Sequence, residues 1–211
     1  MKNTARTIKM DIEQILEQIK KLPRKDEGEI YLSSLKPLIK NLGKDHHLAI
    51  RLWETKNKAA REIAVRIAEP EKTNEELLEK WVKDLNEWGL TDAFTGHLVK
   101  YTSFAVSKSY EWAEQEPEFI RRAGFATIAQ MAWAKNDFDD TVFIKFLPLI
   151  DKMASDDRFY VKKAVNWALR DIGKRNPKLQ KHAQQLAKKL QQSDNKTACW
   201  VGKHRCKEFM T

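Results

Sequence analysis

A tryptophan surrounded by basic residues is the first feature of this sequence that could take part in chemistry. On a helical wheel of residues 158–175, four side chains cluster within about 60° of one another: Lys163, Trp167, Arg170 and Lys174. The apolar stripe lies on the opposite side and contains Val161, Val165, Ala168 and Ile172. This pattern is typical of a nucleic-acid surface, where an indole contacts sugars or bases and cations contact phosphates. The alternative is that Trp167 packs in the interior, because an inner helix of a stacked pair can be buried on both sides.

A second candidate pair, Trp88 and Asp92, lies in the segment WVKDLNEWGLTDAF. Its apolar stripe places Trp88 at the edge of a helix, and Gly89 is positioned to end that helix. Thr91 or Asp92 would then cap the next helix. Trp88 at the rim of the core and Asp92 as a cap would explain both residues without any function.

Basic residues open three similar strings, Arg61-EIAVRIA, Arg122-AGFATIA and Lys163-AVNWALR. The shared position predicts that these cations line one face, to which Arg121 could also contribute. An ion pair with a neighbouring Glu is the competing account of the arginines.

Other constellations are weak. Cys199, His204 and Cys206 match no common zinc spacing and lack a fourth ligand. The sequence contains no Gly-rich phosphate loop, GxSxG elbow, HExxH motif or paired CxxC. We therefore expect no metal and no cofactor, which leaves Asp or Glu, Arg or Lys, and Trp for any chemistry.

Charge is distributed unevenly along the 211 residues. Residues 141–211 contain 16 basic and 6 acidic residues, whereas residues 1–140 contain 23 and 24, so the net charge of +9 arises in the last third. Such a field is typical of a protein that binds a phosphate backbone, and the alternative is a solubilising surface.

Composition excludes several classes. An apolar content of 42% with seven Trp can build a core, and 13 Gly and Pro are too few for the turns of a β-sandwich or barrel. No stretch approaches the roughly 20 apolar residues of a membrane span. With two cysteines and no signal-peptide core at the N-terminus, we expect a cytoplasmic protein that does not bind membranes.

Helical periodicity extends along nearly the whole chain and predicts an all-α protein. The expected helices cover residues 5–21, 27–42, 45–55, 57–68, 74–88, 92–101, 103–115, 117–134, 140–153, 157–174, 177–192 and 195–209. Arg122 and Lys163 are 41 residues apart, within the period of about 40–47 residues of HEAT and armadillo helix pairs. We therefore expect one domain over residues 1–211, a HEAT-like helical-repeat solenoid with a concave basic face; an irregular bundle is the alternative.

Four segments together resemble one known family. They are DHHLAIRLWETKNKAAREIA (45–64), EKWVKDLNEWGLTDAF (79–94), FIRRAGF (119–125) and FYVKKAVNWALRDIGKRNP (159–177). The chain resembles the DNA alkylation repair family of HEAT-like-repeat DNA glycosylases over roughly residues 35–190, and its first 35 residues match less well.

The resemblance implies roles for individual residues. Trp88, Asp92 and Trp167 match the family's catalytic positions, and Arg122, or else Arg121, matches its arginine. Members remove N3- and N7-alkylated purines from DNA without a metal and without flipping the base into a pocket. Some proteins with this fold bind DNA and excise nothing.

Resemblance and residues together predict a monomeric, monofunctional glycosylase that acts on alkylated purines in double-stranded DNA. Asp92, Trp88 and Trp167 would form the catalytic group, and cations would bind DNA phosphates: Arg61, Arg121, Arg122, Lys163, Arg170 and Lys174. The alternatives are a DNA-binding repeat protein that excises no base and a protein-interaction scaffold.

Overall fold

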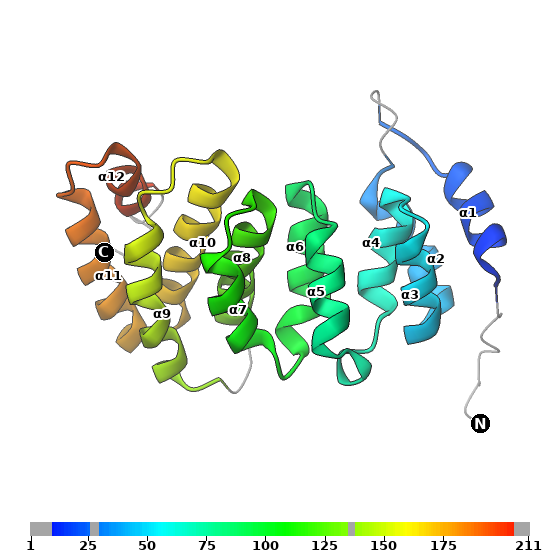
Figure 1. Ribbon diagram of the computed structural model, residues 1–211, viewed down its shortest axis with the longest axis horizontal. Helices are drawn as coiled ribbons and strands as arrows, with labels where there is room; N and C mark the ends of the chain where they lie inside the picture. The colour runs from blue at the N-terminus through cyan, green and yellow to red at the C-terminus, as the bar shows by residue number, and fades with distance from the viewer. Residues whose placement is uncertain (1–9, 26–29, 135–137, 205–211) are drawn as a thin grey trace. The chain divides into compact units, whose positions relative to one another are not determined.

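The computed structural model describes residues 10–25, 30–134 and 138–204. These residues form α1 (Ile12–Lys20), α2 (Leu32–Leu42), α3 (His46–Glu54), α4 (Lys58–Ile67), α5 (Glu75–Lys83), α6 (Trp88–His97), α7 (Ala105–Glu114), α8 (Glu118–Trp133), α9 (Asp140–Met153), α10 (Phe159–Arg175), α11 (Pro177–Gln191) and α12 (Lys196–Lys203) (Figure 1). Two short 3-10 helices, η1 (Pro70–Lys72) and η2 (Val99–Tyr101), precede α5 and α7. Within the described ranges, no helix combines the length and apolarity that crossing a bilayer requires.

Two compact units make up the chain, Met1–Leu77 and Leu78–Thr211. In the first unit α3 packs against α4, and both α1 and α2 contact this pair. Its core includes the buried side chains of Ile15, Leu38 and Trp53. The single domain and the concave face that we expected over residues 1–211 stay predictions.

The helices of the second unit stack in two rows. In one row α8 packs against both α6 and α10, and α10 also contacts α12 (Figure 1). In the other row α7 contacts α9 and α9 contacts α11, while α7 pairs with α8 and α11 with α10. Each helix therefore buries its apolar side on the next one, as stacked helical repeats do.

Helix α8 is the central member of its row, and its sequence is apolar or small nearly all round. Every residue from Arg121 to Ala129 is buried. A helix with such a surface must be covered on more than one side. Gly124 allows the closest approach, because a Cβ there would overlap the backbone of Ala113 and lie 2.9 Å from the carbonyl oxygen of Ser109.

The segment around Gly89 folds differently from the expectation. The helix predicted over 74–88 ends at Lys83, and the next one begins at Trp88 rather than at residue 92. Gly89 therefore does not end a helix: among the glycines of the described ranges a positive φ occurs at Gly43, and Gly89 lies in the first turn of α6. Asp92 is not a cap either, because Glu87 holds that position in an extended conformation.

The bounds of the first two helices and of the last helix also differ from the prediction. Helix α1 begins at Ile12 after its cap Asp11, and α2 begins at Leu32 rather than at residue 27. Helix α12 ends at Lys203, so the end of the helix predicted over 195–209, with Cys206, lies outside the described residues.

A glycine pair tests the close approach of α7 and α8. We expect Gly124→Ala to lower the free energy of unfolding by about 1–3 kcal/mol, because the methyl group would force two backbones apart. Gly89→Ala is the matched control, since the nearest atom to its Cβ lies 3.9 Å away and alanine favours a helix by about 0.5–1 kcal/mol. Denaturant titrations of both variants measure the difference; equal stabilities would contradict the packing at Gly124.

Candidate functional site

Asp92 and Arg122 form an ion pair between neighbouring helices of the same row. The Nε and Nη2 atoms of Arg122 on α8 donate to Oδ1 of Asp92 on α6 at 3.1 and 2.8 Å. Nη2 also donates to Oδ2 at 2.8 Å. Both carboxylate oxygens are therefore held by one planar guanidinium, the geometry that makes arginine–carboxylate pairs strong and directional.

Arg122 is itself fixed by the third helix of the row. Its Nη1 donates to the carbonyl oxygen of Tyr160 at 2.8 Å, and the guanidinium lies 5.9 Å from the Tyr160 ring centre. The Arg122 side chain is only 7% exposed, whereas that of Asp92 is 22% exposed. Arg122 therefore orients the carboxylate from the buried side, and Asp92 is the member of the pair that reaches the surface.

Burial changes the protonation behaviour of Asp92. Desolvation raises the pKa of its carboxyl above the ordinary value of 3.8, and the charge and hydrogen bonds of Arg122 oppose that rise without cancelling it. Arginine stays protonated throughout the physiological range, so its charge favours the ionised form of Asp92. A fixed, partly desolvated anion is suited to stabilise a positive charge that develops near it.

Trp88 lies one helical turn before Asp92, at the start of α6. Residues four apart on a helix share a face, so the indole and the carboxylate are neighbours on the surface of α6. Trp88 is 54% exposed, so its side chain is accessible to a ligand. The predicted place of Trp88 near the end of a helix is wrong, because Trp88 opens α6.

Trp167 combines features of the two interpretations, a nucleic-acid surface and packing in the interior. It is half-buried and packs against the core of the second unit, while its Nε1 donates to Oδ2 of Asp171 at 2.7 Å. Trp167 lies seven residues beyond Tyr160 on α10, which corresponds to about 10 Å along the helix axis. The pair Trp167–Asp171 therefore occupies a second place along the same row.

The cations of α10 have different surroundings. Lys163 is exposed and its Nζ lies 4.1 Å from the Phe159 ring centre. Arg170 is partly exposed and its Nε lies 3.4 Å from Oδ1 of Asp171. Lys174 is exposed near the end of the helix. The predicted apolar stripe of α10 is confirmed, because all four of its members are fully buried: Val161, Val165, Ala168 and Ile172.

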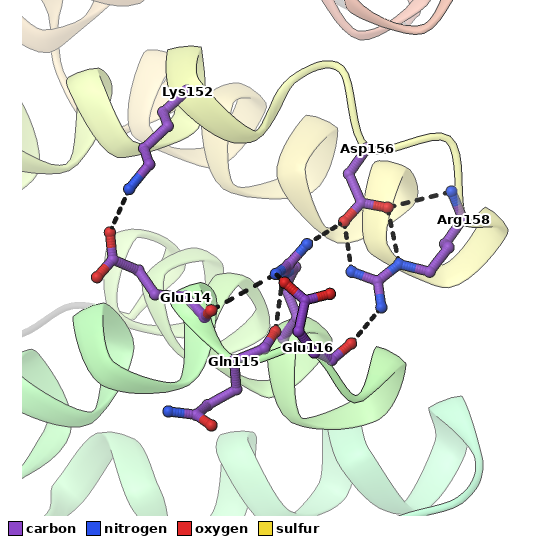
Figure 2. Close-up of polar contacts among 7 residues, drawn as sticks. Glu114, Gln115, Glu116, Lys152, Asp156 and Arg158 are labelled. Carbon is purple, nitrogen blue, oxygen red and sulfur yellow. Dashed lines mark hydrogen bonds and ion pairs between the residues drawn. The ribbon is translucent and has the colours of Figure 1, made fainter.

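Arg121 belongs to a separate polar network with Asp156, Glu116 and Gln115, three residues that are labelled in Figure 2. Its guanidinium donates to Oδ2 of Asp156 at 2.7 Å, to Oε1 of Glu116 at 3.0 Å and to the carbonyl oxygen of Gln115 at 2.8 Å. Arg158 donates to the same Asp156 carboxylate at 2.6 Å. These contacts tie the start of α8 to the loop before α10, which is a structural role.

Arg61 lies in the first unit, on α4. Its Nε donates to the carbonyl oxygen of Trp53 at 3.2 Å, and its guanidinium lies 4.8 Å from the Trp53 ring centre. Its expected alignment with Arg122 and Lys163 stays a prediction. Within the described ranges no cluster of His, Cys, Asp and Glu could hold a metal ion.

Comparison with known proteins identifies the family. The family model described as DNA alkylation repair enzyme matches residues 31–197. The chain belongs to this family. The first residues of the chain lie outside the matched range, which agrees with the weaker resemblance of that segment.

One solved structure supports the architecture of this family member. It is described as "A new family of proteins related to the HEAT-like repeat DNA glycosylases with affinity for branched DNA structures", and the match has a TM-score of 0.79 with 18% identity. The match covers 95% of this chain and 96% of that one. No curated protein matched. The predicted all-α, HEAT-like fold is thereby confirmed.

Two residues of the site escaped the sequence analysis. Tyr160 contributes a backbone carbonyl, which no side-chain pattern reveals. Asp171 is buried, and desolvation raises the pKa of its carboxyl against the lowering effects of Arg170 and Trp167. The sequence pattern could have revealed Asp171, because Trp167 and Asp171 repeat the four-residue spacing of Trp88 and Asp92.

The Arg121 network predicts a loss of stability in acid. Although burial raises the pKa of Asp156, hydrogen bonds from Arg158 and Arg121 lower it from 3.8 to about 2. We expect Asp156→Asn to lower the free energy of unfolding by about 2–3 kcal/mol at neutral pH. Because the pKa of Asp156 is depressed in the folded state, the loss of stability in Asp156→Asn should be complete above pH 3.8. It should shrink as the pH falls towards the folded-state pKa of about 2.

Denaturant titrations of the wild type and of Asp156→Asn at several pH values measure this effect. Lys152→Ala is the control, since its bond to Glu114 joins two exposed side chains. A difference that does not depend on pH would contradict the assignment.

Proposed function

We propose that this protein is a monofunctional DNA glycosylase that removes cationic N3- or N7-alkylated purines from double-stranded DNA. The observation that carries the proposal is the partly exposed Asp92 carboxylate, held by both oxygens on Arg122 with Trp88 one turn away. Membership of the DNA alkylation repair family supports the same conclusion. We further propose that the protein acts as a monomer in the cytoplasm.

The proposed reaction needs one anion and no general acid. An N3- or N7-alkylpurine is already positively charged, so the C1′–N bond can break with its electron pair leaving on the purine, which becomes neutral. Positive charge then develops on the sugar, and the Asp92 carboxylate stabilises it. A water molecule attacks C1′ and its proton passes to Asp92 or to solvent.

The remaining residues would bind the DNA. The exposed ring of Trp88 and the half-buried ring of Trp167 would contact cationic base or sugar, each contributing about 0.5–2 kcal/mol. Lys163, Arg170 and Lys174 would bind phosphates, and Arg122 would act as a positioning residue for Asp92. Arg121 is left out of this interface, because Asp156 and Glu116 occupy its guanidinium.

Asp92→Asn tests the proposal directly. We expect release of 3-methyladenine and 7-methylguanine from methylated duplex DNA to fall by at least about 100-fold, because a neutral amide cannot stabilise the sugar cation. DNA affinity should stay equal or rise, since a negative charge near phosphates is removed. Asp151→Asn is the control, because it neutralises a carboxylate that pairs with the exposed Lys189 on the other row of helices and should retain excision.

One observation favours a second candidate function, DNA binding without excision. The protein of the matching solved structure belongs to a family with affinity for branched DNA structures. If the wild type releases no base above the Asp92→Asn background but binds DNA with a steep salt dependence, the protein binds DNA without excision. If it shows no DNA affinity at moderate salt, both DNA functions fail and a protein-interaction scaffold remains.

The pH dependence of excision tests the ionisation of Asp92. Because the carboxylate form is required and burial raises its pKa, the rate should fall with decreasing pH through an apparent pKa above 3.8. Arg122→Lys keeps the charge but loses the two-oxygen contact, so the same limb should move to higher pH. Single-turnover release, corrected with Asp92→Asn for spontaneous loss of purines, measures both profiles; superimposable profiles would contradict the role of Arg122.

A further inference from the structure

Two exposed aromatic rings flank one lysine in the second unit, away from Asp92. The Nζ atom of Lys100 lies 4.9 Å from the ring centre of Tyr101 and 6.0 Å from that of Trp133. Tyr101 is 62% exposed and Trp133 is 73% exposed, the largest exposed fraction among the described large apolar side chains. We call these three residues, from η2 and the end of α8, the Lys100 platform.

Lys100 is held in a way that suits anion binding. The residue is only 8% exposed, so its aliphatic stem is packed, and its ammonium lies beside both rings. Among the described residues no carboxylate pairs with this ammonium, although most buried cations have such a partner. A cation with open aromatic neighbours therefore has capacity for an external anion.

A cleft of about 410 Å³ adjoins Trp133 on the side facing α10. It is lined by the ends of α8 and α10 and the start of α9: Ala132, Trp133, Ala134, Asp140, Asp171, Lys174, Arg175 and Asn176. Arg175 serves the fold there, since it donates to the carbonyl oxygens of Ala132 and Ala134. Lys174 adds an exposed cation to this cleft. The two carboxylates serve the fold, because Asp140 accepts from Asn176 and Asp171 accepts from Trp167.

We propose that the Lys100 platform and the adjoining cleft bind unpaired nucleotides of a DNA strand. Bases would stack on Tyr101 and Trp133, and phosphates would lie at Lys100 and Lys174. Proteins that bind single strands combine aromatic faces with cations in this way, because every base has a face that can stack. An intact duplex does not fit this role, since its bases already stack on one another.

The platform lies on the same face of α8 as Arg122. Trp133 lies eleven positions after Arg122, which makes about three helical turns and about 16 Å along the axis. This span equals about five nucleotide steps of a stacked strand. One DNA molecule could therefore contact the Asp92 site with its duplex and the platform with an unpaired strand, although binding at the platform does not depend on excision.

The experiment measures the affinity of the full chain for an unmodified single-stranded dT oligonucleotide by fluorescence anisotropy. We expect Trp133→Ala to weaken binding about tenfold or more, and Trp133→Phe, which keeps a stacking face, to weaken it less. Lys100→Gln should weaken binding and reduce the slope of log affinity against log salt by about 0.7. Circular dichroism verifies the fold of each variant.

Tyr31→Ala is the matched control. Tyr31 lies in the first unit, is 44% exposed and has Nζ of Lys25 5.9 Å from its ring centre, so it repeats the chemistry of the platform elsewhere. Equal losses in Tyr31→Ala and Trp133→Ala, or unchanged affinity in Trp133→Ala, would overturn the proposal. Competition by polyglutamate as effective as that by dT would also overturn it, because an acidic protein segment would then be the ligand.

The Asp92→Asn variant separates this inference from the proposed glycosylase. In this background Trp133→Ala should weaken dT binding by the same factor as in the wild type, because Asp92 lies beside Arg122, about three helical turns from Trp133. A wild type that fails to release bases but loses single-strand affinity on Trp133→Ala would refute excision alone. A wild type that excises bases with no effect of Trp133→Ala on single-strand affinity would refute the platform alone.

Discussion

The ion pair between Asp92 and Arg122 is the interaction on which the rest of this site depends. It joins α6 to α8, and the hydrogen bond from Arg122 to the Tyr160 carbonyl oxygen extends the connection to α10. A single guanidinium on α8 thus contacts both neighbouring helices of its row. A carboxylate held in this way cannot rotate away from its position without losing the pair.

The burial of this pair depends on helix α8. Because α8 is covered by α6, α7 and α10, its arginines leave water at a cost that only well-placed acceptors offset. Arg121 and Arg122 meet that requirement with different partners, Asp156 and Asp92. Two adjacent residues of the same type thus point to different places, since neighbours on a helix are about 100° apart. One stabilises a loop, and the other positions a candidate catalytic carboxylate.

The second unit presents several kinds of chemistry along one row of helices. The Asp92 carboxylate and Trp88 lie on α6, the indole of Trp167 bonds to Asp171 on α10, and the Lys100 platform lies at the end of α8. Stacked repeats produce such an arrangement, because equivalent positions of successive helices face the same side. The excess of basic residues after residue 140 adds a positive field to this part of the chain. A long polyanion can use several of these positions at once, whereas a small substrate would use one.

Helical periodicity and composition by themselves determined the all-α architecture, the approximate bounds of most helices and the buried stripe of α10, because these follow from local spacing and apolar content. The sequence also singled out Trp88, Asp92, Trp167 and Arg122. It misplaced the ends of α5 and α6, since a glycine that can end a helix can equally lie in the first turn of the next one. Only the tertiary structure decided which acid faces which arginine, because Asp92 and Arg122 are 30 residues apart and meet through the packing of α6 on α8. The same packing gave Arg122 a backbone partner in Tyr160 and placed Lys100 between Tyr101 and Trp133, contacts that no local pattern encodes.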